Sequence, residues 1–557
     1  MTSRQMEEMN LSEISSKCHR HLRCLRSFRN LIPVDFKGEI VQLSILALPV
    51  FLSQVMMYSI TLVSTGFCGH LGRTELDAVA LATTVINVSG ITVGFGLASA
   101  CDTLISQTYG SRNLKRIGVI VQRAILIVLL TCFPCWAILI NTQSILLALG
   151  QSPEVARLAQ TYVKIFMPAL PASFMSTVAR SYLQNQGCIW PQVITGAVAS
   201  VLNALINYVF LFVLDLGVPG SAAANSISQF SIMVLLFLYI RWRGLHKDTW
   251  GGWSMECLQE WDSYMHLAIP STLMICADWW LYEIGGFLAG LISDVELGAQ
   301  SIIYQIANTA YMLPTGFGIA GSVRVGNALG AGQTEQAKMS AKLAMAGAIS
   351  VATCSSIALG STKDVIAYVF SNDEQITQRV AKVMVLYAPF HLFDGISGAT
   401  VNIVRGLGKQ KIGAILTLTG FYGFGLPVGV TLMFAAKLGI VGLWTSLLIS
   451  VILLSVFMST LLIKLNWEKA TAEARVRAGL QTSETEMDGV KQVEGDKASF
   501  EVQADTEVLT EEQVGVAVTT VGAPLSCRAL ILRRGLTLAA MVSILAVGIV
   551  VYVLLGG

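Results

Sequence analysis

The sequence predicts an all-α polytopic membrane protein: two six-helix lobes related by pseudo-two-fold symmetry along the membrane normal, plus a thirteenth C-terminal span. The low content of charge, the length of the apolar blocks and an internal repeat predict this fold class. Of the 557 residues, 54% are hydrophobic and 13% are charged, whereas soluble domains carry about 25% charged residues. Together with a mean hydropathy of +0.64, this composition argues against a water-soluble globular domain.

The apolar residues form blocks of membrane-spanning length. Residues 121–140 and 447–463, for example, are close to the roughly 20 residues that a helix needs to cross a bilayer. Division of the chain at charged residues, Gly and Pro predicts thirteen spans. They lie at 41–68, 76–108, 115–140, 157–181, 191–214, 218–241, 263–292, 297–328, 338–360, 377–405, 411–435, 438–464 and 536–555.

An internal repeat organises the first twelve spans. Residues 94–98 (GFGLA) recur as residues 316–320 (GFGIA), and Pro49 recurs as Pro270. These pairs, and others along the chain, lie 221 or 222 residues apart. Because the period contains six spans, an even number, the two halves enter the membrane in the same direction as parallel repeats.

Basic residues predict the orientation. Lysine and arginine gather in the N-terminal segment and after the even-numbered spans, whereas the opposite loops carry acids such as Asp215 and Asp294. The positive-inside rule then places the N-terminus in the cytosol and the C-terminus outside. The predicted domains are a cytosolic basic N-terminus (1–40), a first lobe (41–241), a cytosolic inter-lobe linker (242–262), a second lobe (263–465), a disordered acidic cytosolic linker (466–535) and the thirteenth span (536–557).

The C-terminal tail lies outside the repeat. Between residues 481 and 512 it has ten acids and two lysines, a composition typical of disorder. Arg533 and Arg534 are expected to flank the thirteenth span on its cytosolic side. Because the repeat closes at span twelve, we expect the residues beyond about 469 to be dispensable for the function of the two lobes.

Ionisable residues inside the spans are the candidate functional residues, because each costs about 2.5–3.5 kcal/mol at bilayer depth on insertion scales. The first half has few. Its Asp102 and Arg123 lie near the cytosolic ends of spans two and three, where snorkelling or a structural ion pair is expected.

Three carboxylates of the second half are predicted to couple protons or cations. They are Asp278 and Glu283 in span seven and Asp394 in span ten. A structural polar cluster would need a cation, such as Arg324 or Arg405, within reach. A carboxyl group without one can take a proton on one side and release it on the other, or to a cationic ligand.

Helical spacing refines these assignments. Asp278 and Tyr282 are four residues apart and share a helix face, as do Trp279 and Glu283. Asp278 and Glu283 point about 140° apart at ~100° per residue. We therefore expect them to serve different pockets or different states.

Polar and aromatic residues beside these acids are the candidate ligands of a substrate. His391 shares a face with Asp394, so its imidazole is placed to tune that carboxylate. Tyr304, Asn308 and Tyr311 form a stripe in span eight, and aromatic faces beside carboxylates suit bulky organic cations, although such a stripe also serves packing.

The first half offers neutral polar groups, for which hydrogen bonding between helices is the competing interpretation; Asn203 and Asn207 in span five belong to this group. The predicted substrate-binding residues are Trp279, Tyr282, Tyr304, Gln305, Asn308, Tyr311, His391, Gln54 and Asn87.

No Walker motif occurs, so ATP is not expected as the energy source. We expect no cofactor and no metal site.

Three long motifs carry a family resemblance: residues 67–72 (FCGHLG), 100–110 (ACDTLISQTYG) and 322–330 (SVRVGNALG). Through them the chain resembles the multidrug and toxin extrusion (MATE) family over about residues 35–465, and the extra span resembles its vertebrate plasma-membrane branch. The resemblance implies two lobes of six helices, alternating access and cation-coupled efflux of drugs and metabolites. For the vertebrate branch it implies proton/organic-cation antiport at the plasma membrane, apical in excretory epithelium.

The resemblance also implies roles for single residues. Asp278 occupies the key acidic position of span seven, where the vertebrate branch often has Glu, and Glu283 and Asp394 fall on further acidic positions. Gln305 departs from the mammalian pattern, which has Glu there. A glutamine cannot titrate, so any mechanism that needs a fourth carboxylate is in doubt.

Several alternatives remain open on the sequence. The exporter could be coupled to sodium, and a flippase of lipid-linked precursors shares the two-lobe plan but should line its cleft with basic residues. The repeat argues against a seven-helix receptor, and no pore-loop motif indicates a channel. The expected partners are small organic cations, protons and the lipid bilayer. With a net charge of +2 we expect no nucleic acid, and we expect a monomer.

Overall fold

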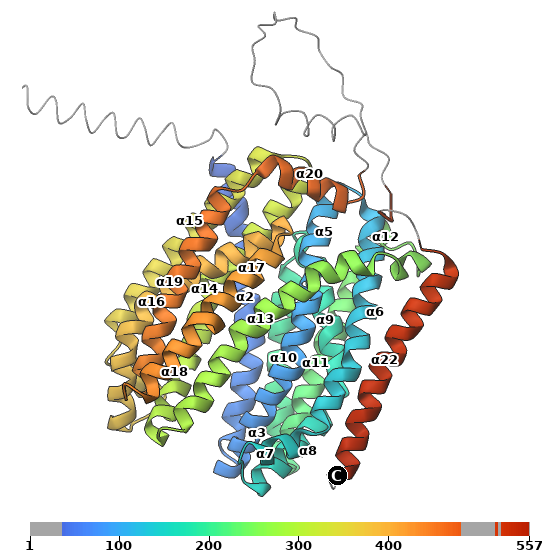
Figure 1. Ribbon diagram of the computed structural model, residues 1–557. Helices are drawn as coiled ribbons and strands as arrows, with labels where there is room; N and C mark the ends of the chain where they lie inside the picture. Colours follow the sequence, from blue (N-terminus) through green and yellow to red (C-terminus); the bar gives the residue numbers. More distant parts are fainter. Residues whose placement is uncertain (1–35, 481–517, 522–524, 556–557) are drawn as a thin grey trace, which may run out of the picture.

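The computed structural model describes residues 36–480, 518–521 and 525–555, and their regular structure is helical (Figure 1). The predicted basic N-terminus up to residue 35 and the acidic stretch at 481–517 lie outside the described residues.

The first half contains six spans, several of them built from consecutive helical segments. They are α2 (Phe36–Cys68); α3 (Arg73–Ile86), η1 (Asn87–Ile91), α4 (Thr92–Ala98) and α5 (Ala100–Gly110); α6 (Leu114–Leu139); α8 (Pro153–Phe166) and α9 (Ala169–Asn185); α10 (Trp190–Tyr208) and η2 (Val209–Val213); and α11 (Gly217–Trp242). Short helices connect them at α7 (Thr142–Ala148), α12 (His246–Thr249) and η3 (Met255–Leu258).

The second half repeats the six spans. They are α13 (Trp261–Gly290); α14 (Asp294–Gly330); α15 (Thr334–Ser361); α16 (Glu374–Leu407); α17 (Gln410–Leu418), η5 (Thr419–Gly425) and α18 (Leu426–Phe434); and α19 (Ile440–Ile463). A short helix, η4 (Ile366–Val369), lies between α15 and α16, and α20 (Trp467–Arg477) and α22 (Cys527–Leu554) follow. Each predicted span coincides with one of these helices or runs of helices.

The repeat seen in the sequence is a structural repeat. Pro49 lies inside α2 and Pro270 inside α13, the first spans of the two halves. Nine of the described spans are long and apolar enough to cross a membrane. The helices α13, α14 and α16 are not among these nine, and they carry the predicted coupling acids and the tyrosine stripe.

Local sequence sets where the helices begin and end. Before α16, the Asp373 carboxylate accepts hydrogen bonds from the backbone N–H groups of Gln375 (2.8 Å) and Ile376 (3.3 Å), which satisfies donors that a helix start leaves free. The same helix ends at Gly408, whose φ of 77° is a left-handed conformation that favours glycine.

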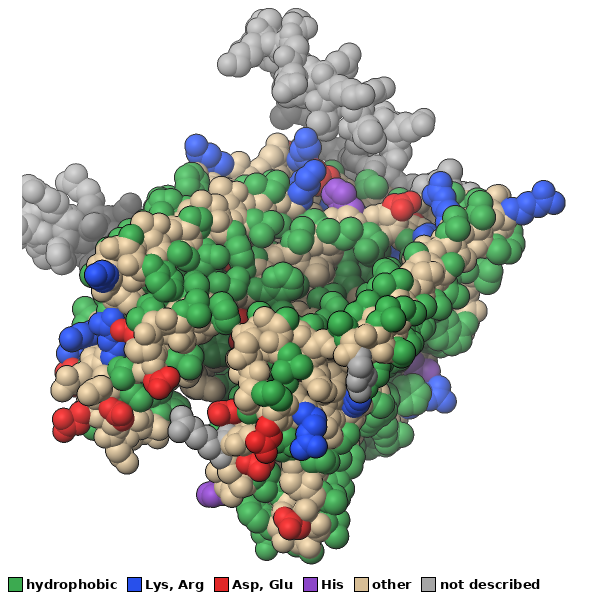
Figure 2. Space-filling model, turned by 60° about the horizontal axis from the view of Figure 1, so that its bottom comes forward, with side chains coloured by type: hydrophobic (Ala, Val, Ile, Leu, Met, Phe, Trp, Pro, Cys, Tyr) green, Lys and Arg blue, Asp and Glu red, His purple; other side chains and the backbone are tan. Residues whose placement is uncertain are grey.

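The two halves are joined tightly at the end of the molecule that carries α20. There α5 of the first half packs against α14 of the second, and a Cβ atom at Gly330 would overlap the carbonyl group of Gln107. Nearby, Gln107 Nε2 donates to the Gly406 carbonyl (2.9 Å) and Thr103 Oγ1 to the Arg405 carbonyl (2.7 Å). Figure 2 shows that the face at the opposite end is hollowed between the two halves.

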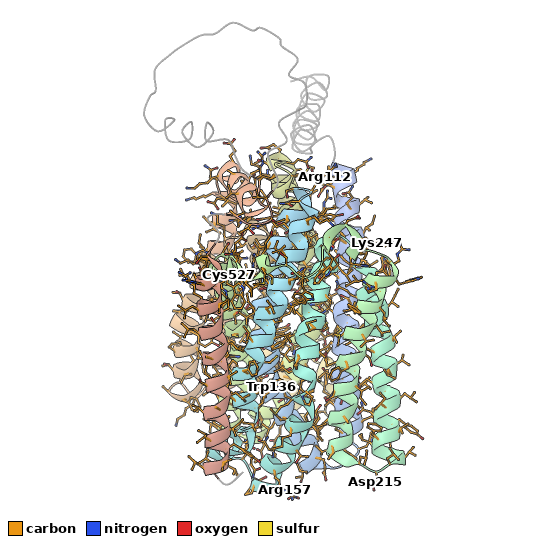
Figure 3. The ribbon with its side chains drawn as sticks, turned by 90° about the vertical axis from the view of Figure 1, so that its right-hand side faces the viewer. Arg112, Trp136, Arg157, Asp215, Lys247 and Cys527 are labelled. Carbon is orange, nitrogen blue, oxygen red and sulfur yellow. The ribbon has the colours of Figure 1, made fainter. Side chains whose placement is uncertain are left out.

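The loops group as the charge pattern predicts. Arg112 and Lys247 lie at the end where α22 begins, and Asp215 lies at the opposite end together with Arg157 (Figure 3). The cytosolic identity of the first end remains a prediction.

The prediction of a disordered linker from residue 466 is wrong for its first part. Residues Trp467–Arg477 form α20, which packs against α5 and α14. Asn466 caps the helix by accepting a hydrogen bond from Lys469 N (3.0 Å), and Ala470 and Ala474 are buried. Small side chains on one face let this helix lie close to the bundle, a tertiary contact that composition does not reveal.

The thirteenth span begins earlier than predicted. Ser526 caps α22 at its start, so Arg533 and Arg534 lie inside the helix. Arg534 packs over the Trp261 ring (4.2 Å) and donates to the Leu258 carbonyl (2.9 Å). These contacts with the start of α13 extend the helix beyond its purely apolar part.

A buried ion cluster holds the inter-half linker to α6. Glu260 forms ion pairs with Arg116 (2.9 Å) and Arg123 (3.1 Å), and all three side chains are at most 8% exposed. Burial raises the pKa of Glu260, but the hydrogen bonds and charges of the two arginines outweigh it and hold the pKa below its ordinary value. For Arg123 the sequence allowed either snorkelling or a structural ion pair, and the structure shows an ion pair.

We expect Glu260→Gln to lower the free energy of unfolding at neutral pH by about 3–5 kcal/mol, since it leaves two buried arginines unpaired. Because the pKa of Glu260 is lowered in the folded protein, its stabilisation is present above the unfolded value of about 4.3 and is lost as the pH falls through the folded value. The variant and the parent should therefore converge in acid. Unfolding in detergent across pH measures both effects.

The matched control is Glu335→Gln, because the Glu335 side chain is 84% exposed. Its ion pair with Lys338 is on the surface, and we expect a change of at most about 1 kcal/mol. A gap between parent and Glu260→Gln that stayed constant down to strongly acidic pH would contradict the charge-based explanation.

Candidate functional site

Aromatic rings line the centre of the second half. Tyr282 on α13 lies 5.6 Å from Tyr304 on α14 and 6.3 Å from Trp444 on α19, measured between ring centroids. Trp444 also contacts Tyr387 and Phe390 on α16, at 5.4 and 5.2 Å. The four helices therefore place a continuous aromatic wall beside the predicted acids.

Asp278 and Asp394 lie close enough for their charges to interact, and Tyr282 and Tyr311 lie within range of both carboxyl groups. Asp278 is on α13 and Asp394 is on α16, and both helices pack against α14 and α19, which bring the two acids within range of each other. Among the described residues neither acid, nor Glu283, forms a salt bridge.

The two arginines that could have neutralised these acids, Arg324 and Arg405, form no ion pair with them among the described residues. Arg324 forms an ion pair with Glu39 of the first half, at 2.5 Å. The charge of Arg405 reaches Asp278, but its closest polar side-chain contact is with Asn402 Oδ1, at 3.5 Å. Arg405 therefore acts on Asp278 only at a distance, through its charge.

Glu283 faces a different environment from Asp278. Its Oε2 accepts a hydrogen bond from Thr84 Oγ1 on α3 of the first half (3.5 Å), and Tyr304 lies beside it. Glu283 therefore lies at the junction of the two halves, while Asp278 lies within the second half. The helical spacing predicted this separation.

Gln305 lies at the same junction. Its Oε1 accepts a hydrogen bond from the Tyr58 hydroxyl of α2. The residue that replaces the expected glutamate therefore contributes a neutral link between the halves. Asn308 lies beside Tyr304, one turn further along α14.

The hydrogen bond of His391 goes to another helix, and none joins it to Asp394 among the described residues. The imidazole is buried, its Nε2 lies 2.8 Å from Ser355 Oγ on α15, and its ring lies against Tyr387 at 6.0 Å. Nδ1 has no hydrogen-bond partner among the described residues. The hydrogen-bond partner of His391 is therefore on the neighbouring helix α15, and not one turn away on α16.

Three other predicted residues, Trp279, Gln54 and Asn87, make no side-chain hydrogen bond among the described residues. Trp279 is 44% exposed, on a face of α13 that is not covered. Gln54 on α2 and Asn87 at the start of η1 are partly buried, and neither makes a side-chain hydrogen bond among the described residues. Trp280, next to Trp279, donates to the Val88 carbonyl of η1 (3.3 Å), so this part of α13 faces the element that begins with Asn87.

Asn203 and Asn207 take part in hydrogen bonding between helices, the structural role that the sequence also allowed. Asn207 Nδ2 donates to Asn203 Oδ1 (3.0 Å), and Asn203 Nδ2 donates to Asn225 Oδ1 (2.9 Å). Asn225 in turn donates to Ser64 Oγ of α2 (3.1 Å). This network ties spans of the first half together.

The aromatic residue at the centre of the wall was missed by the sequence reasoning. Trp444 is fully buried, and its indole N–H donates to Gln300 Oε1 of α14 (2.9 Å). It stands in the apolar block of span twelve, and its only signal was a large amphipathic ring in an otherwise aliphatic helix. Tyr422, which donates to the Ala277 carbonyl next to Asp278 (2.9 Å), was also missed.

Comparison with known proteins agrees with this architecture. The MatE family model matches residues 49–209 and again residues 270–431, which are the two halves of the repeat. The chain belongs to the MatE family. It is 56% identical over 578 residues to multidrug and toxin extrusion protein 1 of Danio rerio, covering 99% of this chain and 98% of that protein. The corresponding Homo sapiens protein is 48% identical, with 95% of each covered.

Solved structures of MatE proteins share the fold. The eukaryotic MATE transporter AtDTX14 matches with a TM-score of 0.77 and 28% identity, over 80% of this chain and 99% of that one. A Vibrio cholerae MATE transporter, the VcmN D35N mutant, matches with a TM-score of 0.71 at 18% identity, over 78% and 100%. The predicted two-lobe fold is confirmed, and the MatE chain is a membrane transporter rather than an enzyme.

Proposed function

We propose that the protein exports organic cations across the plasma membrane in exchange for protons, with Asp278, Glu283 and Asp394 as the coupling residues. The observation that carries the proposal is the pair Asp278 and Asp394, which share an aromatic-walled site without a salt bridge. The names of the relatives, multidrug and toxin extrusion proteins, support an export role.

The site suits a cation on physical grounds. An ionised carboxylate attracts a positive charge, and the faces of Tyr282 and Tyr311 attract it through their quadrupoles, by about 0.5–2 kcal/mol each. Protonation of the carboxylate removes most of that attraction and releases the cation. One group therefore binds either a proton or a substrate, which is the requirement for exchange.

Alternating access supplies the vectorial step. The halves are closed at the α20 end and hollowed at the other (Figure 2). With the basic loops in the cytosol and the C-terminus outside, this conformation faces the exterior, where protons would enter. A conformation open to the cytosol would then load the cation. Glu283, which contacts Thr84 across the junction, is placed to sense that change.

The test is transport of tetraethylammonium into proteoliposomes under an imposed proton gradient, with and without sodium. Export of one monovalent cation against one proton moves no net charge, so the term of about 2.3 kcal/mol per charge per 100 mV cancels. We expect the rate to rise as the pH on the proton-donating side falls, and a clamped voltage to change it little. A steady transport current, or transport unaffected by the proton gradient, would refute proton exchange.

Sodium coupling is the second candidate, because carboxylate oxygens also bind hard cations. It predicts that a sodium gradient drives transport without a proton gradient. A flippase for anionic lipid carriers is disfavoured by the site itself: three acids and one distant arginine would repel an anionic headgroup.

A further inference from the structure

A cavity of about 330 Å³ lies at the α20 end, where α13 and α17 begin beside α20. It is separate from the acidic site, because its lining includes none of the three acids and none of the aromatic residues around them. Its polar lining includes His266, Lys409, Lys411 and Arg477, with Glu473 as the acidic side chain.

The charge of the cavity is positive. Glu473 lies 2.6 Å from Lys409 and 3.7 Å from Arg477, so one carboxylate is shared by two cations. Lys411 is exposed and has no ion-pair partner among the described residues. Two positive charges are thus left to be balanced, and the cavity favours an anionic ligand.

The surface directly below the cavity is apolar. On α13, Ile269 (49% exposed) and Leu273 (48%) follow His266 at helical spacing, and on α17 Ile415 (55%) follows Lys411. The two helices pack against each other, and these exposed apolar side chains lie one to two turns beyond the cavity residues His266 and Lys411.

We propose that this cavity binds the headgroup of an anionic phospholipid, whose acyl chains lie along Ile269, Leu273 and Ile415. Basic pockets between membrane helices bind anionic headgroups, and the cytosolic leaflet is the anionic one. A free phosphate would use only the cations, whereas a lipid uses both the cations and these apolar side chains. Since α20 supplies Arg477 and Glu473, an occupied site also secures α20 to the second half.

The test is native mass spectrometry of the full-length protein in detergent, titrated with phosphatidylserine, phosphatidylcholine or inorganic phosphate. We expect phosphatidylserine to be retained in preference to phosphatidylcholine. Lys411→Glu should weaken phosphatidylserine binding about twentyfold or more, since a basic residue near a membrane surface contributes about a factor of five and charge reversal doubles the free-energy change, which squares that factor. Lys411→Gln should give an intermediate loss.

Lys469→Glu is the matched control, because Lys469 is an exposed lysine of α20 that does not line the cavity. It should leave the affinity within about twofold. Equal losses in Lys411→Glu and Lys469→Glu would reduce the effect to general surface charge and overturn the proposal. Equal retention of phosphatidylcholine, or inorganic phosphate that binds as tightly as the lipid, would overturn it too. None of these outcomes depends on proton-coupled transport.

Discussion

Asp278→Asn is expected to abolish proton-driven export of an organic cation, by at least about a hundredfold, while the protein still folds and reaches the membrane. The amide keeps the size of the side chain but can neither bind a proton nor carry a negative charge. No salt bridge depends on Asp278 among the described residues, so its removal breaks no ion pair, and Arg405, whose charge reaches it, keeps its contact with Asn402. It also removes an insertion cost of up to about 3.5 kcal/mol, which favours expression.

The measurement is the initial rate of tetraethylammonium transport in proteoliposomes, normalised to the amount of correctly folded protein. Asp278→Glu should keep a large part of the activity, because it retains the carboxyl group. Asp294→Asn makes the same chemical change at the exposed start of α14, and we expect it to be silent. A well-expressed Asp278→Asn variant with normal proton-driven export would remove Asp278 from the mechanism.

Deletion of α20 should have the second-largest effect. A chain that ends at residue 480 is expected to transport at a rate near that of the full chain, whereas one that ends at residue 466 should lose most of its activity and stability. Arg477 ties the halves together: its guanidinium donates to Gln107 Oε1 of the first half (3.0 Å) and to the Leu407 carbonyl of the second (3.0 Å). Hydrogen bonds from a charged group are worth about 1.5–3 kcal/mol each.

This expectation revises the one from the sequence, which placed the dispensable region beyond about residue 469. Both truncations lack α22, so their comparison isolates α20. Thermal unfolding and the transport rate should be measured for each, together with Arg477→Gln in the full chain, which should reproduce part of the loss. If the two truncated chains were equally stable and active, α20 would be a passive attachment.

Much of the fold could be predicted from the sequence because the relevant signals are local or periodic. Apolar length marks nine of the described spans, basic loops mark one side, and the recurrence of Pro49 as Pro270 marks the two halves. Helical spacing also predicted that Asp278 and Glu283 face different surroundings, since the pitch of a helix follows from its hydrogen bonds alone.

The partners of these residues were decided by tertiary structure. Arg324 was free on the sequence to reach the acids, and packing of α2 against α14 gave it Glu39 instead. His391 forms its hydrogen bond with Ser355 on α15, and not with Asp394 one turn away on its own helix.

By itself, the sequence determined the membrane class, the thirteen spans, the repeat and the identity of the unusual acids. These follow from composition, length and period, each of which a single helix expresses without neighbours. Tertiary structure alone decided that Asp278 and Asp394 lie within range of each other's charge, that Trp444 completes an aromatic wall, and that Trp467–Arg477 is a packed helix. Such contacts join residues on different helices, and which helix faces meet depends on the packing of the whole bundle.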